Sequence, residues 1–193
     1  MATPRLRVIT GRAGGRRLVA PPHVRPTTER VREAVFSALG DHVVDAAVLD
    51  LYAGSGALAV EALSRGAAVA VLVDADRAAT AACQANLDTT GLAALARVRT
   101  APVARFLAGA PPGEAPFDLV LVDAPYAAAP TEVTPVLEAL TQPGWLTSEA
   151  RVVLETAAMS PPPEPAGTMP LEVRSRRKYG DTLVTTLGTV PRA

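Results

Sequence analysis

The residues of this chain best suited to chemistry are Asp123-Ala124-Pro125-Tyr126, which follow an apolar run at residues 117–122. The run has the length of a buried strand, so these residues are expected at its carboxyl end. Asp123 and the Ala124 carbonyl are suited to accept the two N–H bonds of an exocyclic amine on a nucleobase. Pro125 restricts Ala124 to an extended conformation, and Tyr126 offers a face on which a base can stack. Such alignment directs the lone pair of the amine at an electrophile.

The second candidate site is the glycine-rich turn Asp50-Leu51-Tyr52-Ala53-Gly54-Ser55-Gly56, between an apolar run at residues 47–51 and a helical pattern at 57–64. Glycines after a strand and before a helix let the backbone approach a ligand closely. Asp74 ends the next strand-like run, where an acidic residue can accept hydrogen bonds from ribose hydroxyls. These features predict a cofactor that carries adenosine, and both NAD and S-adenosylmethionine fit that description.

Asp50 separates these two cofactors by charge. It lies near the place of the pyrophosphate in an NAD complex, and like charges about 4 Å apart repel by roughly 1 to 4 kcal/mol. S-adenosylmethionine instead carries a sulfonium and an ammonium, which the same carboxylate attracts. The turn therefore favours S-adenosylmethionine, and together with the Asp123 motif it predicts methyl transfer to a base nitrogen. The alternative is that Asp50 only accepts hydrogen bonds from loop amides.

Short apolar runs alternate with helical patterns through the middle of the chain. Strands are predicted at residues 47–51, 68–73, 97–100, 117–122 and 151–155, helices at 57–64, 77–87, 103–107 and 133–140, and a closing antiparallel hairpin at 171–174 and 182–187. This alternation predicts a parallel sheet covered by helices on both faces. Ligands of such sheets bind beyond the carboxyl ends of the strands, where Asp50, Asp74 and Asp123 all fall. Asp76 is expected to cap the following helix.

The N-terminal region carries its own elements. Residues 5–10 and 16–19 alternate basic and apolar side chains around glycines, a pattern that predicts a β-hairpin. Thr27 or Thr28 can cap a helix that runs to about Leu39 along one apolar stripe.

The composition is that of a folded protein of one domain, since 49% of the 193 residues are hydrophobic. Every apolar run ends well before about 18 residues, so no membrane span is predicted. No apolar segment follows the N-terminal arginines, so we expect no secretory signal and a cytoplasmic protein. The single cysteine, Cys83, is expected to be buried in an Ala-rich helix. His23 and His42 lack metal-ligand spacing, and no metal site is predicted.

The formal net charge is zero, but the charges are separated along the chain. Residues 1–40 hold eight arginines against two acids, and residues 41–173 hold sixteen acids against six arginines. Residues 174–193 hold five basic side chains against one acid. This distribution predicts an acidic body between two basic segments that face a polyanion.

Several stretches together resemble one family. They are Arg7-Val8-Ile9-Thr10-Gly11, Gly15-Arg16-Arg17-Leu18, Arg25-Pro26-Thr27-Thr28-Glu29-Arg30-Val31-Arg32-Glu33 with Phe36, residues 50–63, Asp74-Ala75-Asp76-Arg77 and residues 123–126. With these stretches the chain is similar to the small bacterial 16S ribosomal RNA guanine-N2 methyltransferases, within the S-adenosylmethionine-dependent amino methyltransferases. The Arg-Pro-Thr-Thr segment is far more specific than the glycines.

The resemblance implies a Rossmann-like class I α/β fold with a mostly parallel seven-stranded sheet and helices on both faces. It also implies a single methyltransferase domain over residues 1–193. Within it, residues 1–40 form a basic extension of a hairpin and a helix, and residues 41–193 form the catalytic body. The implied substrate is a guanine of 16S rRNA, presented on the 30S subunit or its assembly intermediate, and the implied protein is a monomer.

The resemblance also assigns residues to each ligand. Those implied to bind the cofactor are Asp50, Tyr52, Ala53, Gly54, Ser55, Gly56, Asp74, Ala75, Pro102 and Val103. Those implied to bind RNA are Arg5, Arg7, Arg12, Arg16, Arg17, Arg25, Thr27, Thr28, Arg30 and Arg32, with pairing of Arg30 or Arg32 to Glu29 or Glu33 as the alternative. The chain departs from the family at Ala124, where a proline is usual, and at Pro102, near an Asp or Asn that often accepts the adenine amino group.

Two other functions remain open from the sequence. The same motif serves any exocyclic amine, so a DNA or other RNA adenine-N6 methyltransferase is possible, although no separate target-recognition domain is visible. A nucleic-acid-binding assembly factor that has lost catalysis is the alternative outside enzymes. Asp123, Pro125 and Tyr126 argue against it, and Ala124 leaves it open.

Overall fold

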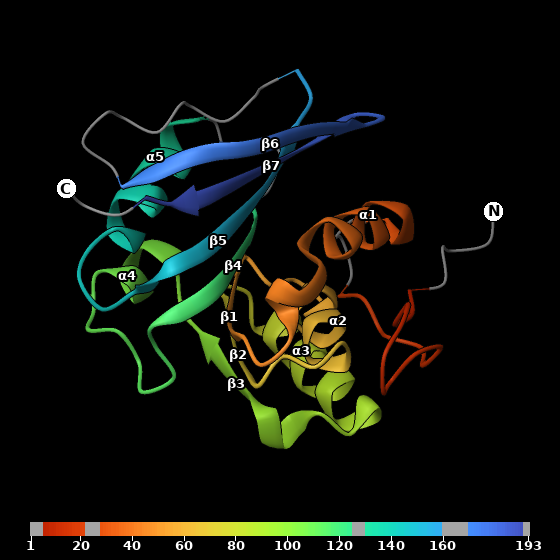
Figure 1. The fold of residues 1–193 in the computed structure, drawn as a ribbon. Helices are drawn as coiled ribbons and strands as arrows, with labels where there is room; N and C mark the ends of the chain where they lie inside the picture. Colours follow the sequence, from red (N-terminus) through yellow and green to blue (C-terminus); the bar gives the residue numbers. More distant parts are fainter. Residues whose placement is uncertain (1–5, 22–27, 125–129, 160–169, 191–193) are drawn as a thin grey trace.

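The computed structural model describes residues 6–21, 28–124, 130–159 and 170–190, and its centre is a seven-stranded sheet (Figure 1). The strand order is β3-β2-β1-β4-β5-β7-β6. The strands are β1 (Ala47–Leu51), β2 (Val69–Asp74), β3 (Ala96–Thr100), β4 (Phe117–Asp123), β5 (Leu146–Ala157), β6 (Leu171–Tyr179) and β7 (Thr182–Thr189). The first five pair in parallel, and β7 runs antiparallel to both β5 and β6. The predicted α/β class and parallel sheet are confirmed.

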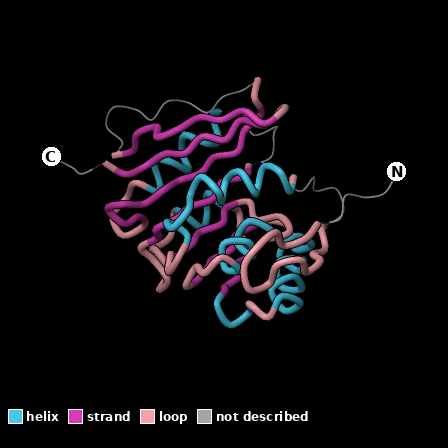
Figure 2. Tube along the Cα trace, turned by 45° about the vertical axis from the view of Figure 1, so that its right-hand side comes forward, coloured by secondary structure: helices cyan, strands magenta, loops and turns pink. Residues whose placement is uncertain are grey.

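Helices cover both faces of this sheet (Figure 2). They are α1 (Glu29–Leu39), α2 (Ala57–Ser64), α3 (Arg77–Thr90), α4 (Val103–Leu107) and α5 (Pro130–Leu140), with short 3-10 helices η1 (Gly40–Val43) and η2 (Ala93–Leu95). Apolar residues of α1, α2 and α3 form one core with alternate strand residues such as Val48 and Leu121. Those of α4 and α5 form a second core with the intervening residues, such as Leu49 and Val122. Each central strand is therefore buried on both sides, which explains its continuous apolar sequence.

Helix termini follow the signals in the sequence. The Thr28 side chain accepts a hydrogen bond from Val31 N at the start of α1, and Asp76 accepts one from Ala78 N at the start of α3. Gly91, with a φ of 74°, ends α3 in the left-handed conformation that glycine adopts without strain. Both predicted caps are confirmed.

The last strands are longer than predicted. Strand β6 continues to Tyr179, through a run of charged residues that the sequence pattern does not mark as a strand. It lies at the edge of the sheet, where only one neighbouring strand is present and both faces tolerate charge. Strand β5 likewise begins at Leu146, ahead of the predicted residue 151.

The segment of residues 6–19 lies against α2 and α3, on the side of the first core (Figure 2). It forms a rudimentary hairpin, with one antiparallel bridge between Arg7 and Arg17 and a hydrogen bond from Val8 N to Arg16 O of 2.9 Å. Val8 and Leu18 are buried in the first core. The predicted hairpin is confirmed, although most of its backbone bonds go to the helices rather than across it.

Glu61 and Ser64 of α2 hold this segment in place. The buried Glu61 carboxylate accepts hydrogen bonds from Ile9 N and Thr10 N, at 2.7 and 3.1 Å. Ser64 accepts one from Ala13 N through its hydroxyl, at 3.0 Å. Because these backbone donors are bound by side chains of α2, the hairpin adopts one position on the body.

No helix in the described part of the chain is both long and apolar enough to cross a membrane.

Gly11 is the tightest point of this contact, and we expect Gly11→Ala to displace the segment. An added Cβ would lie 1.9 Å from the carbonyl oxygen of Ser64, and the φ of 85° is unfavourable for alanine. Several hydrogen bonds worth about 0.5–1.5 kcal/mol each would then be lost. Limited proteolysis and urea unfolding measure the change.

Gly15→Ala is the matched control, because Gly15 has a similar φ of 81° and an added Cβ there meets nothing within 4 Å. It should cost only the backbone strain, about 1 kcal/mol. Equal stability of the two variants would contradict the proposed close contact.

Candidate active site

Three acidic residues meet at one edge of the sheet. In the register, Asp50 of β1 pairs with Leu72 of β2 and with Leu121 of β4. Asp74 and Asp123 each lie two residues further on, at the carboxyl ends of their strands. The edge formed by these strand ends is where ligands bind in open α/β sheets, at the point where the strand order reverses between β1 and β4.

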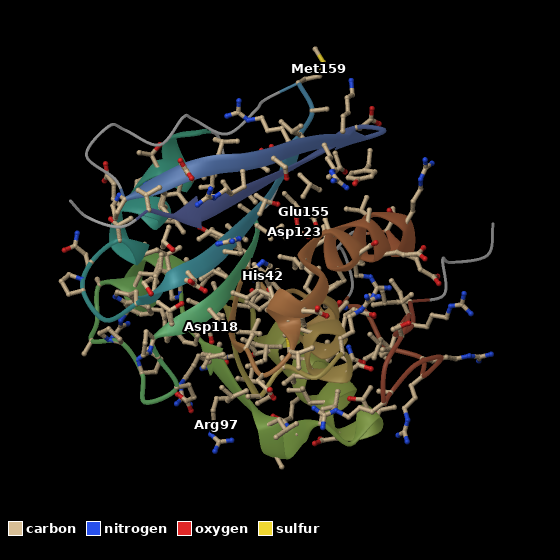
Figure 3. All side chains as sticks on the ribbon, in the orientation of Figure 1. His42, Arg97, Asp118, Asp123, Glu155 and Met159 are labelled. Atoms are coloured by element: carbon tan, nitrogen blue, oxygen red, sulfur yellow. The ribbon has the colours of Figure 1, made fainter. Side chains whose placement is uncertain are left out.

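The three carboxylates also share one face. Leu72 and Leu121 belong to the core beneath α1, α2 and α3, and side chains two residues apart on a strand point to the same side. Glu155 of β5, paired in register with Asp123, joins them, and the two are neighbours in Figure 3. The predicted convergence of Asp50, Asp74 and Asp123 is therefore present in the structure.

The glycine-rich turn is hydrogen-bonded to the end of β2, including Asp74. Gly54 N donates a hydrogen bond to Asp74 Oδ2 at 2.8 Å, and Ala53 N donates one to Val73 O at 3.1 Å. Asp74 Oδ1 accepts a further bond from Asp76 N at 2.9 Å. These bonds hold the turn next to the end of β2, and each carboxylate oxygen of Asp74 keeps a lone pair for a ligand.

Gly56 lets the turn enter α2. Its φ is 72°, and an added Cβ would lie 2.8 Å from Leu72 Cδ2 and 3.1 Å from Cys83 Sγ. The Cys83 thiol donates to Gly54 O at 3.4 Å, and burial raises the pKa of this thiol. Cys83 is therefore a packing residue behind the turn, and its predicted burial is confirmed.

Asp50 is buried behind the same turn, with only 1% of its surface exposed. Its pKa is raised to about 8: burial is the largest cause, the bond from Ala59 N opposes the rise, and the nearby charges of Asp123 and Asp74 add to it. Asp50 Oδ2 accepts that bond at 3.1 Å, whereas Oδ1 has no hydrogen-bond partner among the described residues. Because burial disfavours the ionised form of Asp50, a positively charged ligand beside it would stabilise the carboxylate strongly.

Pro102 and Val103 lie beside this edge. They follow β3, whose last residue Thr100 pairs in register with Asp74. Ala101 N donates a hydrogen bond to Asp74 O at 2.9 Å. Pro102 is exposed at the start of α4 and brings no side-chain acceptor, so a contact with adenine would have to come from the backbone around it.

Asn86 of α3 connects the turn to the N-terminal segment, a role that the sequence pattern does not predict. Its amide nitrogen donates to Ser55 O and to Val19 O, both at 2.8 Å, and its oxygen accepts from Val19 N at 2.8 Å. Nothing in its helical surroundings distinguishes Asn86 in sequence, because its partners are distant along the chain. Glu61 carried a signal, since it is the only charge in the apolar helix Ala57–Ser64.

Arg32 was predicted to bind RNA, and its position in the structure contradicts this role. It is fully buried, its Nη2 donates to Arg7 O at 2.8 Å, and its nearest carboxylate is Glu61 at 3.9 Å. Burial lowers the pKa of its guanidinium, and the neighbouring acids oppose that shift. A side chain without exposed surface cannot reach a phosphate, and Glu29, its suggested alternative partner, forms its ion pair with Arg7 instead.

The other described arginines of the set remain at the surface. Arg12 donates two hydrogen bonds to Leu63 O, and Arg16 donates one to Thr89 O. Arg17 and Arg30 are exposed. Those predicted residues that lie outside the described part of the chain are Arg5, Arg25, Thr27, Pro125 and Tyr126.

This combination of fold and site defines a class. A sheet of order 3-2-1-4-5-7-6, with a glycine-rich turn after β1 and carboxylates at the ends of β1, β2 and β4, is that of a class I methyltransferase. A family model described as "Conserved hypothetical protein 95" matches residues 6–188, and the chain belongs to this family.

Known relatives agree with this assignment. "Ribosomal RNA small subunit methyltransferase D" of Escherichia coli strain K12 is 42% identical over 153 residues, which cover 78% of this chain and 74% of that protein. The solved structure of yhhF from Escherichia coli superposes with a TM-score of 0.82 at 34% identity, covering 97% of this chain and 99% of that one. An RNA methyltransferase from Salinibacter ruber, at 16% identity and a TM-score of 0.64 over 88% of this chain and 96% of that one, shares the fold.

Proposed function

We propose that this protein transfers a methyl group from S-adenosylmethionine to the exocyclic N2 amine of a guanine in 16S rRNA. The observation that carries this function is the position of Asp123, which ends β4 on the same face and edge of the sheet as Asp50 and the glycine-rich turn. A base amine held at Asp123 is thereby next to the place of the cofactor.

The residues present fit S-adenosylmethionine, whose sulfonium supplies an electrophilic methyl group. Asp74 is suited to accept hydrogen bonds from ribose hydroxyls, and the backbone of residues 52–56 allows close approach. Asp50 Oδ1, which has no hydrogen-bond partner among the residues that the structure describes, is suited to a positively charged group of the cofactor. A pyrophosphate beside this buried acid would disfavour its ionised form further and gain no attraction from it, which argues against a nicotinamide dinucleotide.

Asp123 and Ala124 act on the substrate in this proposal. The Asp123 carboxylate and the Ala124 carbonyl accept the two N–H bonds of the amine, so that its lone pair points to the methyl group. Ala124 directly follows the end of β4 and is 8% exposed, and it lacks the proline ring usual in the family. Pro125 and Tyr126 complete the motif in sequence, since a proline restricts the residue before it and a tyrosine side chain is suited to stack on a base.

The substrate class is supported by the relatives, of which the Escherichia coli protein is named for the small-subunit ribosomal RNA. The exposed arginines of the N-terminal segment supply phosphate contacts that position the RNA without reading its bases. We place the reaction in the cytoplasm, on the 30S subunit or its assembly intermediate, and assign it to a monomer with residues 1–193 as one domain. Residues 1–40 are its RNA-binding extension.

Incubation with radiolabelled S-adenosylmethionine tests the function directly. Separate pools of 30S particles, naked 16S rRNA and DNA are supplied, and the modified nucleoside is identified by chromatography. We expect label in N2-methylguanosine from small-subunit RNA. Label in N6-methyladenosine, or label in DNA alone, would identify the protein as a DNA or other RNA adenine-N6 methyltransferase. The absence of label in every pool would favour an assembly factor.

We expect Asp123→Ala to lower kcat by at least about 100-fold, because the variant no longer orients the amine. Its affinity for S-adenosylmethionine should stay within a few-fold of wild type, since the turn at residues 52–56 is unchanged. Single-turnover methylation and calorimetric titration measure the two effects separately.

Asp118→Ala is the control on the same strand. Asp118 accepts a hydrogen bond from Ala47 N at 2.9 Å, near the opposite end of β4 from Asp123 (Figure 3). This variant should lose about 1 kcal/mol of stability and keep its turnover. Wild-type turnover in Asp123→Ala would refute the role of that residue.

Cofactor affinity should depend on pH through Asp50. With its pKa raised to about 8, the empty site holds this side chain mostly protonated at pH 7, and a bound cation favours the carboxylate. Binding then releases a proton, so affinity should fall by up to about tenfold for each pH unit below 8 and level off above it. Calorimetry in buffers of different ionisation enthalpy counts the released proton.

Asp50→Asn should bind more weakly at pH 8 and should lose this component of the pH dependence. The ammonium of the cofactor titrates identically with both proteins, so the difference between them isolates Asp50. Identical pH profiles for the two proteins would show that Asp50 does not respond to the bound cation.

A further inference from the structure

The end of β6 carries a basic cluster that the proposed site does not use. It consists of Arg176, Arg177 and Lys178, all exposed, and we call it the β6 cluster. Arg177 and Lys178 form no ion pair with any residue in the described part of the chain. In contrast, Arg174 near the other end of the strand pairs with Glu172.

The register of the sheet connects this cluster to the proposed catalytic residue. Asp123 of β4 pairs with Glu155 of β5, Glu155 pairs with Val184 of β7, and Val184 pairs with Arg177 of β6. Three steps between strands separate the first and last of these residues, which corresponds to about 14 Å between their Cα atoms. A few nucleotides of RNA span that distance.

Arg177 also lies on the proposed substrate side of the sheet. Residues paired in register point to the same face, so Arg177 shares the face of Asp123 and Glu155. This face carries α1 and the N-terminal segment. In Figure 1 the turn between β6 and β7 and the N-terminal segment both lie at the right of the view, the turn above α1 and the segment below it. Lys178 is one residue further toward the turn, on the opposite face.

The negative charge around the proposed site means that RNA needs a second group of cations near it. Asp74, Asp123 and Glu155 concentrate negative charge where an RNA strand must approach. Phosphates are repelled there unless cations lie close by, and among the described N-terminal arginines Arg12 and Arg16 supply them from the α2 and α3 side. The β6 cluster lies beyond β5 and β7, at the other flank of the acidic edge.

We propose that Arg177 and Lys178 bind phosphates of the RNA strand that carries the target base, on the flank of the site away from the N-terminal segment. This surface deepens the proposed function and rests on it for the identity of the RNA. The strand is then held on both sides of the base that enters the site.

A different role would also explain charges on an edge strand. Lysine and arginine at a sheet edge prevent pairing with a second molecule. In that case their removal would promote association of the protein and leave RNA binding unchanged, so the two roles give different results.

The test compares wild type with Arg177→Ala/Lys178→Ala and with Arg151→Ala/Arg174→Ala. The second pair removes the same formal charge at a place further from Asp123, beside Gly188, which pairs in register with Arg151 and with Glu172. Affinities for naked 16S rRNA and for 30S particles are measured over a series of NaCl concentrations. Methylation kinetics, thermal melting and size-exclusion chromatography accompany them.

We expect Arg177→Ala/Lys178→Ala to weaken RNA binding about tenfold near physiological salt. The slope of log K against log[NaCl] should become shallower by about 1.4, as loss of two phosphate contacts to a single strand requires. KM for RNA should rise while kcat and cofactor affinity stay unchanged, and the control pair should match wild type.

Three results would overturn the proposal: an unchanged salt slope, equal weakening by both double variants, or association of the first variant with wild-type RNA affinity. Failure of the proposed function is distinguishable from these, because it appears as absent methyl incorporation in wild type. RNA affinity is measured without methyl transfer, so it judges the β6 cluster separately.

Discussion

The proposed function depends on one feature of the structure, which is the cluster of carboxyl side chains at one edge of the sheet. Parallel pairing of β1, β2, β4 and β5 brings Asp50, Asp74, Asp123 and Glu155 to the same edge and the same face. Burial is the main cause that raises the pKa of Asp50 to about 8 in the empty protein, and repulsion from Asp123 and Asp74 adds to it. A cationic methyl donor relieves this repulsion, while a phosphate-rich cofactor would increase it. The same feature that destabilises the empty site therefore selects its ligand.

A second set of buried polar groups fixes the N-terminal segment relative to that site. Glu61 binds backbone donors of the segment and the side chain of Arg65, and Asn86 bonds both Val19 and Ser55. Because Val19 and Ser55 are far apart along the chain, the bonds from Asn86 fix the proposed RNA-binding surface relative to the cofactor turn. Since a buried polar group is costly when a partner is lost, this connection resists displacement of either part.

The separation of charge along the sequence becomes a separation in space. Acids of the central region meet at the sheet edge, exposed N-terminal arginines lie beside α2 and α3, and the cations of β6 lie beyond β5 and β7. A polyanionic substrate that must bring one neutral base to an acidic site fits this pattern, because its phosphates contact the flanks while the base enters the centre. Arg32 shows the limit of reasoning from charge alone, since it serves the interior and not the substrate.

The sequence by itself determined the α/β class, the two caps, and the places of Asp50, Asp74 and Asp123 at strand ends. These features depend on local patterns: apolar runs, glycines and capping side chains. Only the tertiary structure decided which charged residues are buried and which strands are neighbours. Arg32 and Arg30 look alike in sequence, but one packs against Glu61 and the other remains at the surface. The row of paired residues from Asp123 to Arg177 crosses four strands, and its register arises from long-range pairing that no local pattern encodes.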